Sequence, residues 1–223
     1  GVVTNEDVDY YVVEAKKGQR IAAEVEAMRL GTTLFDPYVA ILDAKRFEMA
    51  SADDSPLVFQ DAVVSAVAPA DGRYIIEVRE SAYGGNGSCR YRLHVGTFPR
   101  PTAVYPAGGQ LGQEVEVTFL GDASGPFKQK FKLPGQERDL FEVEPSAGGQ
   151  VAPSGNRFRL FPHGNNLEVE PNNEIAKATP SELPKAFNGI IEKKGDIDFF
   201  KFAAKKGQVF DIECYARRLR SGL

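Results

Sequence analysis

The chain contains part of its own sequence twice. Residues 8–34 align without a gap with residues 197–223, and 11 of the 27 aligned positions are identical. The identities cluster in three blocks, an Asp-x-Asp-aromatic-aromatic run, Ala-Lys-Lys-Gly-Gln and Ala-x-Arg-Leu. A repeat of this kind indicates two copies of one building block, and it constrains the fold more than any other pattern. We therefore expect three parts: a nearly complete module at 1–97, a connecting region at 98–165, and the N-terminal part of a second module at 166–223.

Hydrophobic and polar residues alternate along most of the chain. Ile21, Ala23 and Val25 occupy one side of an extended segment, and Glu24 and Glu26 occupy the other. The same alternation recurs in three further stretches, at residues 39–42, 74–78 and 91–95. A period of two is typical of strands with one buried and one solvated face, and glycine-, proline- and aspartate-rich turns separate these stretches. The pattern predicts an all-β antiparallel sandwich, with no more than one or two helical turns near residues 172–179.

Charge and hydropathy exclude two classes of partner. The net charge is −4, so the chain lacks the basic surface that nucleic-acid binding requires. It has no run of about 18 apolar residues, so we expect no membrane span. No signal peptide is visible, and the chain begins inside the first module, which we interpret as the start of an excised piece.

Several short motifs occur together around the second copy. They are Glu-Val-Glu-Pro-Asn-Asn at 168–173, Ala-Thr-Pro at 178–180, Gly-Asp-Ile-Asp-Phe-Phe at 195–200 and Lys-Gly-Gln at 206–208. This set resembles the opening of the bacterial pre-peptidase C-terminal (PPC) domain. The first copy resembles the same domain but lacks any counterpart of its first strand. The stretch at 99–117 is similar to the opening of immunoglobulin-like TIG domains.

The resemblance implies a fold, a location and a role. The fold would be a jelly-roll-like antiparallel β-sandwich at 1–97, a small Ig-like β unit with a linker at 98–165, and a partial second sandwich at 166–223. The protein would be secreted, periplasmic or attached to the bacterial cell surface. It would serve as a non-catalytic accessory or structural module whose partners are the neighbouring domains of its parent protein. The alternatives are a module that binds polysaccharide or a collagen-like fibrous protein, and a removable accessory domain of a secreted peptidase.

Some PPC relatives bind calcium, and the matching residues define a candidate metal site. It comprises six oxygen-bearing side chains: Glu168, Glu170, Asn172, Asn173, Asp196 and Asp198. Calcium takes six to eight oxygen ligands from carboxylates, amides and carbonyls, which such a set can supply. The alternative is a proline-fixed turn in which Asn172 or Asn173 caps a short helix and Asp198 accepts backbone amides. Only Asp7 and Asp9 remain in the first copy, so its site should be empty or half-built.

The sequence offers no catalytic constellation. Its two histidines, His94 and His163, have no serine or cysteine nucleophile motif nearby, and zinc-ligand spacing is absent. A second acidic group, Asp53-Asp54-Ser55 with Asp61, is more typical of a solvated turn than of a metal site. We therefore expect no enzyme activity from this chain.

Cysteines and aromatic residues leave alternatives open. Cys89 and Cys214 lie in different copies and are either two buried thiols or a disulfide pair. Phe35, Tyr38 and Tyr83 fall in or near turns, where exposed rings could stack on saccharides, although most aromatic residues of the chain alternate like core residues.

Strand number predicts an unusual pairing. Residues 168–223 hold only three or four expected strands, too few to close a sandwich alone. The first module lacks its leading strand and would have an open edge. We therefore expect Leu183–Ile191 or its neighbours to add to an edge of the first module, in the same molecule or in a strand-exchanged oligomer.

Overall fold

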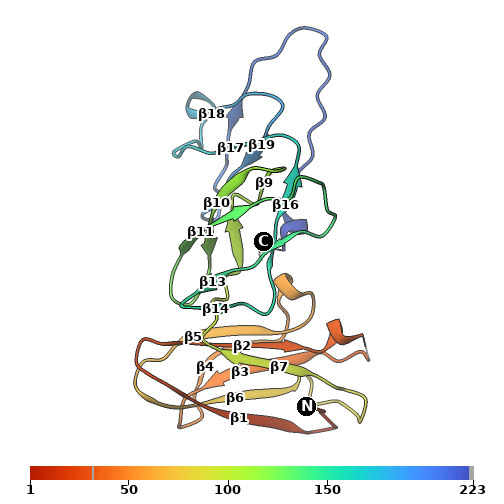
Figure 1. Cartoon of the computed structure of the whole chain (residues 1–223), viewed down its shortest axis with the longest axis vertical. Helices are drawn as coiled ribbons and strands as arrows, with labels where there is room; N and C mark the ends of the chain where they lie inside the picture. Colours follow the sequence, from red (N-terminus) through yellow and green to blue (C-terminus); the bar gives the residue numbers. More distant parts are fainter. Residues whose placement is uncertain (32, 221–223) are drawn as a thin grey trace.

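The computed structural model describes residues 1–31 and 33–220, and within them the chain is all-β, as predicted. Three parts follow one another along a long axis, and the C-terminal end folds back beside the middle part (Figure 1). The helical elements of this portion are four short 3-10 turns, none long or apolar enough to cross a membrane. We call residues 1–97 the first sandwich, 98–165 the middle unit and 166–220 the C-terminal part.

The first sandwich consists of two antiparallel sheets. One has the order β1-β6-β3-β4, formed by β1 (Val8–Ala15), β6 (Gly72–Glu80), β3 (Pro37–Leu42) and β4 (Glu48–Ala52). The other has the order β5-β2-β7, formed by β5 (Val63–Val67), β2 (Arg20–Glu26) and β7 (Arg92–Gly96). Two 3-10 turns lie in its loops, η1 (Met28–Leu30) and η2 (Pro56–Val58).

The core of the first sandwich lies between its two sheets. Alternate residues of each strand point inward, so that Val25 of β2, Val39 and Ile41 of β3 and Ile76 of β6 are fully buried in one cluster. Burying such side chains away from water is the main source of stability for a sandwich. Val3 also joins this core, and its N–H donates to the Cys89 carbonyl at 2.9 Å.

The middle unit has a separate core. Its main sheet has the order β11-β10-β8, formed by β11 (Phe127–Lys132), β10 (Glu114–Leu120) and β8 (Ala103–Tyr105). Three short pairs of strands complete the unit: β9 (Gly108–Gln110) with β16 (Arg159–Phe161), β12 (Glu142–Val143) with β15 (Asn156–Arg157), and β13 (Ser146–Ala147) with β14 (Gln150–Val151). A further pair, β17 (Asn165–Leu167) with β19 (Ala186–Asn188), begins the C-terminal part. Val117, Phe119 and Phe158 are buried in the core cluster of this unit.

The C-terminal part has little regular structure. β18 (Thr179–Pro180) pairs in parallel with β20 (Phe200–Lys201), and two 3-10 turns, η3 (Ile175–Lys177) and η4 (Arg217–Leu219), complete it. Val209 and Ile212 are 89% and 84% exposed. The repeat aligns residues 210–216 with β2, and their alternation predicts a strand there; this prediction is wrong for the described residues. β5 and β7 flank β2, whereas no strand of the described chain flanks this segment.

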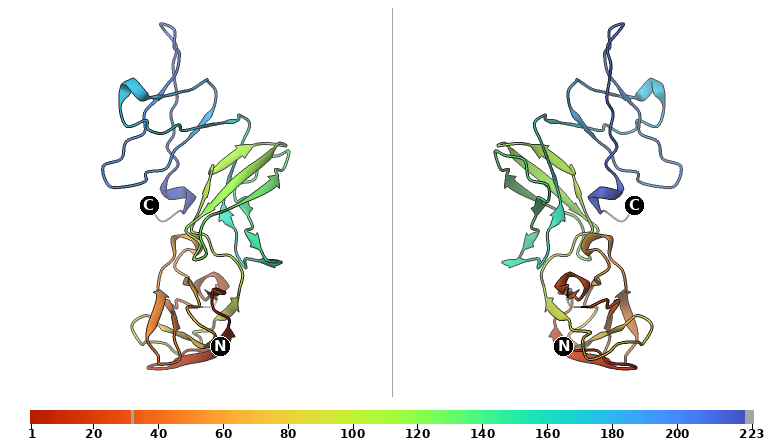
Figure 2. Two further views of the ribbon diagram at one scale, coloured as in Figure 1. Left: turned by 90° about the vertical axis from the view of Figure 1, so that its left-hand side faces the viewer. Right: turned by 90° about the vertical axis from the view of Figure 1, so that its right-hand side faces the viewer.

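The prediction of strand addition within the molecule is also wrong. β19, which lies inside the expected Leu183–Ile191 segment, pairs with β17 and not with the first sandwich. The middle unit separates the C-terminal part from the first sandwich along the long axis (Figure 2), so that β19 cannot reach a sandwich edge. Strand exchange between molecules stays a prediction.

The two copies nevertheless share their local backbone. Gly18 and Gly207 have φ values of 83° and 86°, in the left-handed region that glycine adopts readily. Lys16 N–H donates to the side-chain oxygen of Gln19 at 2.9 Å, and Lys205 N–H donates to that of Gln208 at 2.7 Å. The turns η1 and η4 also occupy aligned positions. The repeat thus encodes the same turns in both places, and the comparison ends at Arg220 because residues 221–223 lie outside the described residues.

Candidate metal site

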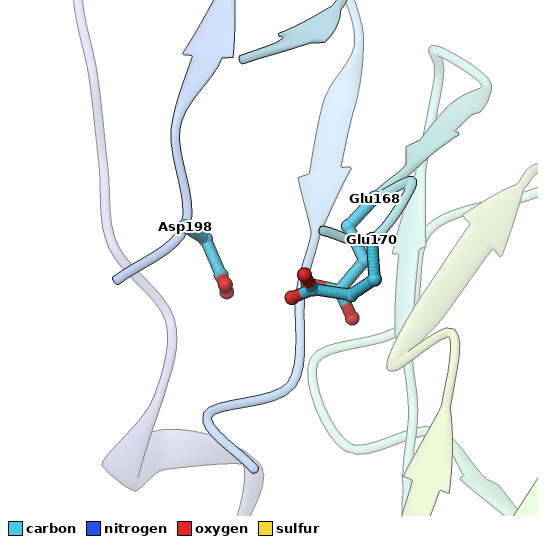
Figure 3. A group of neighbouring side chains, drawn as sticks. All are labelled: Glu168, Glu170 and Asp198. Carbon is cyan, nitrogen blue, oxygen red and sulfur yellow. The ribbon is translucent and has the colours of Figure 1, made fainter. Parts of the chain in front are cut away.

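Three carboxylates converge in the C-terminal part. Glu168, Glu170 and Asp198 each offer an oxygen atom, and these atoms lie within 4.8 Å of one another. Glu168 and Glu170 follow β17, whereas Asp198 precedes β20, so that two segments direct their side chains into one space (Figure 3). This arrangement brings together three of the six side chains that the sequence selected.

Backbone pairing and one glycine position the cluster. Glu168 N–H donates to the Asn188 carbonyl at 2.9 Å, and Ile190 N–H donates to Glu168 Oε1 at 2.8 Å. Gly189 lies between those two contacts, and a Cβ atom there would lie 2.9 Å from Glu168 Oε2 and closer still to Asp198 Oδ2. A side chain at position 189 would therefore displace at least one of the two carboxylates from its present place.

The cluster concentrates negative charge without a compensating cation. None of the three carboxylates forms an ion pair with a side chain of residues 1–31 or 33–220. Burial, followed by the charge of Asp198, raises the pKa of Glu168 to about 7. Burial, followed by the charge of Asp196, also raises the pKa of Asp198. Protonation of Glu168 or a bound cation would relieve this repulsion.

Buried oxygen atoms without hydrogen-bond partners border the same space. Among the described residues, Glu168 Oε2, Asn172 Oδ1 and Asp198 Oδ1 are buried and accept no hydrogen bond. Asn172 is fully buried, and its backbone N–H donates to Glu170 Oε2 at 2.9 Å. Leaving a buried oxygen unpaired costs about 1–3 kcal/mol, so these three oxygens are sites where an ordered water or a cation would be favourable.

The other two predicted ligands contact each other. Asn173 Nδ2 donates to Asp196 Oδ1 at 2.8 Å, and Glu192 N–H donates to Asp196 Oδ2 at 2.8 Å. These contacts use both carboxylate oxygens of Asp196, which lies outside the group of three. A role for Asn173 and Asp196 as ligands stays a prediction.

The helix-capping alternative is wrong. The N-cap of η3 is Glu174, and no side-chain hydrogen bond caps the turn. Asp198 accepts no backbone N–H from the described part of the chain, and its Oδ1 is without a partner. Both predictions of that alternative therefore fail.

The first copy satisfies its equivalent aspartate differently. Asp9 aligns with Asp198, and it accepts a hydrogen bond from the Tyr91 hydroxyl. The Tyr91 hydroxyl also lies 2.6 Å from that of Tyr11. Burial, followed by the hydrogen bond to Asp9, raises the pKa of Tyr91, so the hydroxyl stays protonated and remains a donor. Neutral hydroxyl groups thus neighbour the aspartate in the first copy, whereas carboxylates neighbour it in the second.

A buried ionic network joins the first sandwich to the middle unit, and sequence patterning missed it. Glu24 was expected on a solvated face but is fully buried, 2.9 Å from Arg29 Nη2 and 3.0 Å from Arg100 Nε. Arg100 and Ser154 both belong to the middle unit, which covers this side of β2. The Ser154 hydroxyl donates a hydrogen bond to Glu24. The only signal in the sequence was an arginine between two prolines at 99–101.

Asp61 belongs to the same network and is not part of a solvated acidic turn. Its carboxylate accepts the backbone N–H groups of Ala27 at 3.0 Å and Met28 at 2.7 Å, and it pairs with Arg29 Nε at 2.6 Å. The side chain is fully buried, and its hydrogen bonds with the free amides at the start of η1 compensate for the loss of water. The interpretation of Asp61 as part of a solvated turn is therefore wrong.

The two cysteines are neither a disulfide nor two buried thiols. Both are free, but Cys89 is buried and Cys214 is exposed. Phe35 is buried against Tyr91. Tyr38 and Tyr83 both hold the guanidinium of Arg79, at 3.7 Å and 4.3 Å from their ring centroids.

The histidines take part in ordinary side-chain contacts. His94 Nε2 lies 3.0 Å from Glu26 Oε1, and His163 packs edge-on against Phe161. No serine or cysteine hydrogen-bonds to either ring in the described part of the chain. Both histidines therefore have contacts within the fold.

No family model matches this chain. No curated protein matches it either. The resemblance to PPC and TIG domains therefore stays a prediction.

Proposed function

We propose that this chain is a non-catalytic structural module of a secreted or cell-surface bacterial protein, and that calcium bound by Glu168, Glu170 and Asp198 stiffens it. The observation that carries the proposal is the convergence of three carboxylates within 4.8 Å with no ion-pair partner among the described residues. Like charges at this separation destabilise one another unless a proton or a cation intervenes. Burial, followed by the charge of Asp198, raises the pKa of Glu168 to about 7, so both its surroundings and its neighbour disfavour the free carboxylate.

The donor set fits calcium better than a transition metal. All side-chain donors are oxygen atoms, which calcium prefers, whereas zinc favours histidine and cysteine ligands. Asn172 Oδ1 would add a neutral oxygen, and backbone carbonyls and water would complete a coordination number of six to eight. With few rigid ligands, we expect an affinity of roughly 10⁻⁴ to 10⁻³ M, typical of extracellular modules.

The neighbourhood of the cluster explains how a cation would stiffen the molecule. The Tyr105 hydroxyl of the middle unit donates to the Asn188 carbonyl at 3.2 Å, and Ala107 N–H donates to Asn188 Oδ1 at 3.2 Å. Asn188 also accepts the N–H of Glu168, so the cluster adjoins the contact between the middle unit and the C-terminal part. Bound calcium would link Glu168 to Asp198 within the C-terminal part, directly beside this contact, and would reduce the freedom of the two segments that carry them.

A calorimetric calcium titration tests the proposal. At about pH 8, above the pKa of Glu168, the wild-type chain should release or absorb heat on binding, and Glu170→Gln should bind at least about tenfold more weakly. Glu182→Gln removes an exposed carboxylate that forms no ion pair with any described residue, and it serves as the matched control. A wild-type chain that gives no heat and no change in stability up to about 10⁻² M calcium would exclude the site.

The alternative of a saccharide-binding module has less support. Of the three aromatic residues that suggested it, Phe35 is buried, and Tyr38 and Tyr83 are already engaged by Arg79. The alternative of a removable peptidase accessory rests on the family resemblance alone.

A further inference from the structure

In the first copy, an ion pair between β2 and the following turn η1 contacts the middle unit. Glu24 and Arg29 lie five residues apart at the end of β2 and in η1, and their side chains are 2.9 Å apart. Arg100 of the middle unit lies 3.0 Å from the second oxygen of Glu24. The side chains of Glu24 and Arg100 are 0% and 1% exposed, so this contact is a closed part of the fold.

The second copy contains the same ion pair at the aligned positions. Glu213 and Arg218 also lie five residues apart, and their side chains are 3.0 Å apart. The turns η4 and η1 also end in the same left-handed backbone conformation, with Arg220 at φ 56° and its aligned residue Gly31 at φ 66°. The repeat therefore reproduces the contact and not only the sequence.

The second pair also faces an arginine of the middle unit. Arg159 of β16 lies 3.9 Å from Glu213, and its guanidinium lies 3.5 Å from the ring centroid of Tyr215. Beyond the middle unit, the guanidinium of Arg220 lies 3.4 Å from the ring centroid of Phe59 in the first sandwich. The turn η4 is accordingly seen beside the middle unit, close to the first sandwich, in both views of Figure 2.

Burial separates the two contacts. Glu213, Arg159 and Arg218 are 58%, 35% and 69% exposed, whereas Glu24 is fully buried. Water and salt screen exposed ion pairs, and such pairs contribute little, whereas breaking a buried pair leaves an unpaired charge in the interior. The first contact is therefore permanent on the timescale of the folded state, and the second can open.

We propose that residues 213–220 form a releasable latch, which folds the C-terminal part back onto Arg159 of the middle unit and Phe59 of the first sandwich. In the closed state the middle unit contacts both copies of the Glu-Arg pair. Its Arg100 contacts Glu24 in the first copy, and its Arg159 contacts Glu213 in the second. In the open state the segment swings away and the C-terminal part remains joined to the middle unit through the contacts of Asn188. The proposal does not depend on calcium.

The exposed thiol of Cys214 allows a direct test, because Cys89 is only 2% exposed and will not react under native conditions. A nitroxide attached to Cys214 in the full chain, in a chelating buffer, should show a mainly restricted spectrum at low ionic strength. Arg159→Ala should raise the mobile fraction at least about twofold, because it removes both the stacking and the charge contact. About 0.5 M sodium chloride should change the spectrum in the same direction.

Matched variants keep the test decisive. Arg217→Ala removes an exposed arginine of the same turn that forms no ion pair, and it should leave the spectrum unchanged. If Arg159→Ala fails to fold, Glu213→Gln opens the latch from the exposed side. A restricted spectrum that neither variant nor salt alters would overturn the proposal, and so would a fully mobile spectrum in the wild-type chain.

Discussion

At the scale of single residues, the partly or fully buried carboxylates of this molecule have two opposite kinds of neighbour. Glu24 and Asp61 are buried, but arginines and backbone amides surround them. Glu168 and Asp198 are only partly exposed and have other carboxylates as neighbours. The first arrangement sets each buried carboxylate against opposite charge, whereas in the second, burial and neighbouring carboxylates raise the pKa of Glu168 and of Asp198.

Removing the charge of Glu24 should be costly. Glu24→Gln leaves Arg29 and Arg100 without a counter-charge in the interior, and we expect a loss of about 3–5 kcal/mol in the free energy of unfolding. Urea unfolding with an unchanged m-value measures this loss. The control is Glu14→Gln, since Glu14 is 81% exposed and 3.8 Å from Arg73, and it should change stability by less than about 1 kcal/mol. Equal effects of the two variants would contradict the role of the buried network.

The raised pKa of Glu168 predicts a pH dependence. The folded pKa is about 7, above the ordinary value of 4.5, so the folded state binds the proton more tightly. The resulting stabilisation is complete below about pH 4.5 and is lost as the pH rises through about 7. Without metal, hydrogen-exchange protection at residues 186–200, taken as the ratio of wild type to Glu168→Gln at each pH, should fall between pH 5 and pH 8. A ratio that is flat or rises with pH would contradict the repulsion inferred for this cluster.

At the scale of elements, the same sequence forms strands in one copy and not in the other. Residues of β1 and β2 in the first copy pair with β6, β5 and β7. In the second copy only β20 forms a ladder, with β18, and residues 202–216 have no ladder in the described chain. Alternation of apolar residues therefore predicts a capacity for strand formation, which neighbouring strands must complete.

Gly189 connects element pairing to the candidate site. Gly189→Ala would place a methyl group against Glu168 and Asp198, so we expect it to displace one carboxylate and weaken calcium binding by about tenfold or more. The comparison is Gly87→Ala, where an added Cβ would meet no atom within 4 Å. Calorimetry on both variants, with circular dichroism to check folding, would show an effect confined to Gly189→Ala. Unaltered binding in that variant would remove the three-carboxylate geometry from consideration.

At the scale of the whole molecule, the two junctions differ in kind. The first sandwich and the middle unit share a buried ionic network and a small apolar cluster of Ala22, Phe98 and Ala152. The middle unit and the C-terminal part share polar contacts, such as the Tyr105 hydroxyl to the Asn188 carbonyl at 3.2 Å. We therefore expect the first two parts to move as one body, and the C-terminal part to move relative to them until the latch restrains it.

Much of the local structure followed from the sequence alone. The alternation predicted an all-β sandwich, and the repeat predicted matching turns at Gly18 and Gly207. Glu168, Glu170 and Asp198 belong to the six residues that the PPC resemblance implies as calcium ligands, and carboxylate oxygens are ligands that calcium prefers. The alternation and the turns depend on neighbours in the chain, and short-range physics determines them.

Only the tertiary structure decided which faces are covered. Glu24 has the pattern of a solvated residue, but the middle unit buries it, because an arginine 76 positions later supplies the counter-charge. The second copy has the pattern of a strand pair, but it remains largely open because no strands flank it in the described chain. The sequence by itself determined the turns, the alternating faces and the acidic residues, which are local properties. Burial, ion pairing and the convergence of the carboxylates depend on segments far apart in the chain, and the fold alone brings those together.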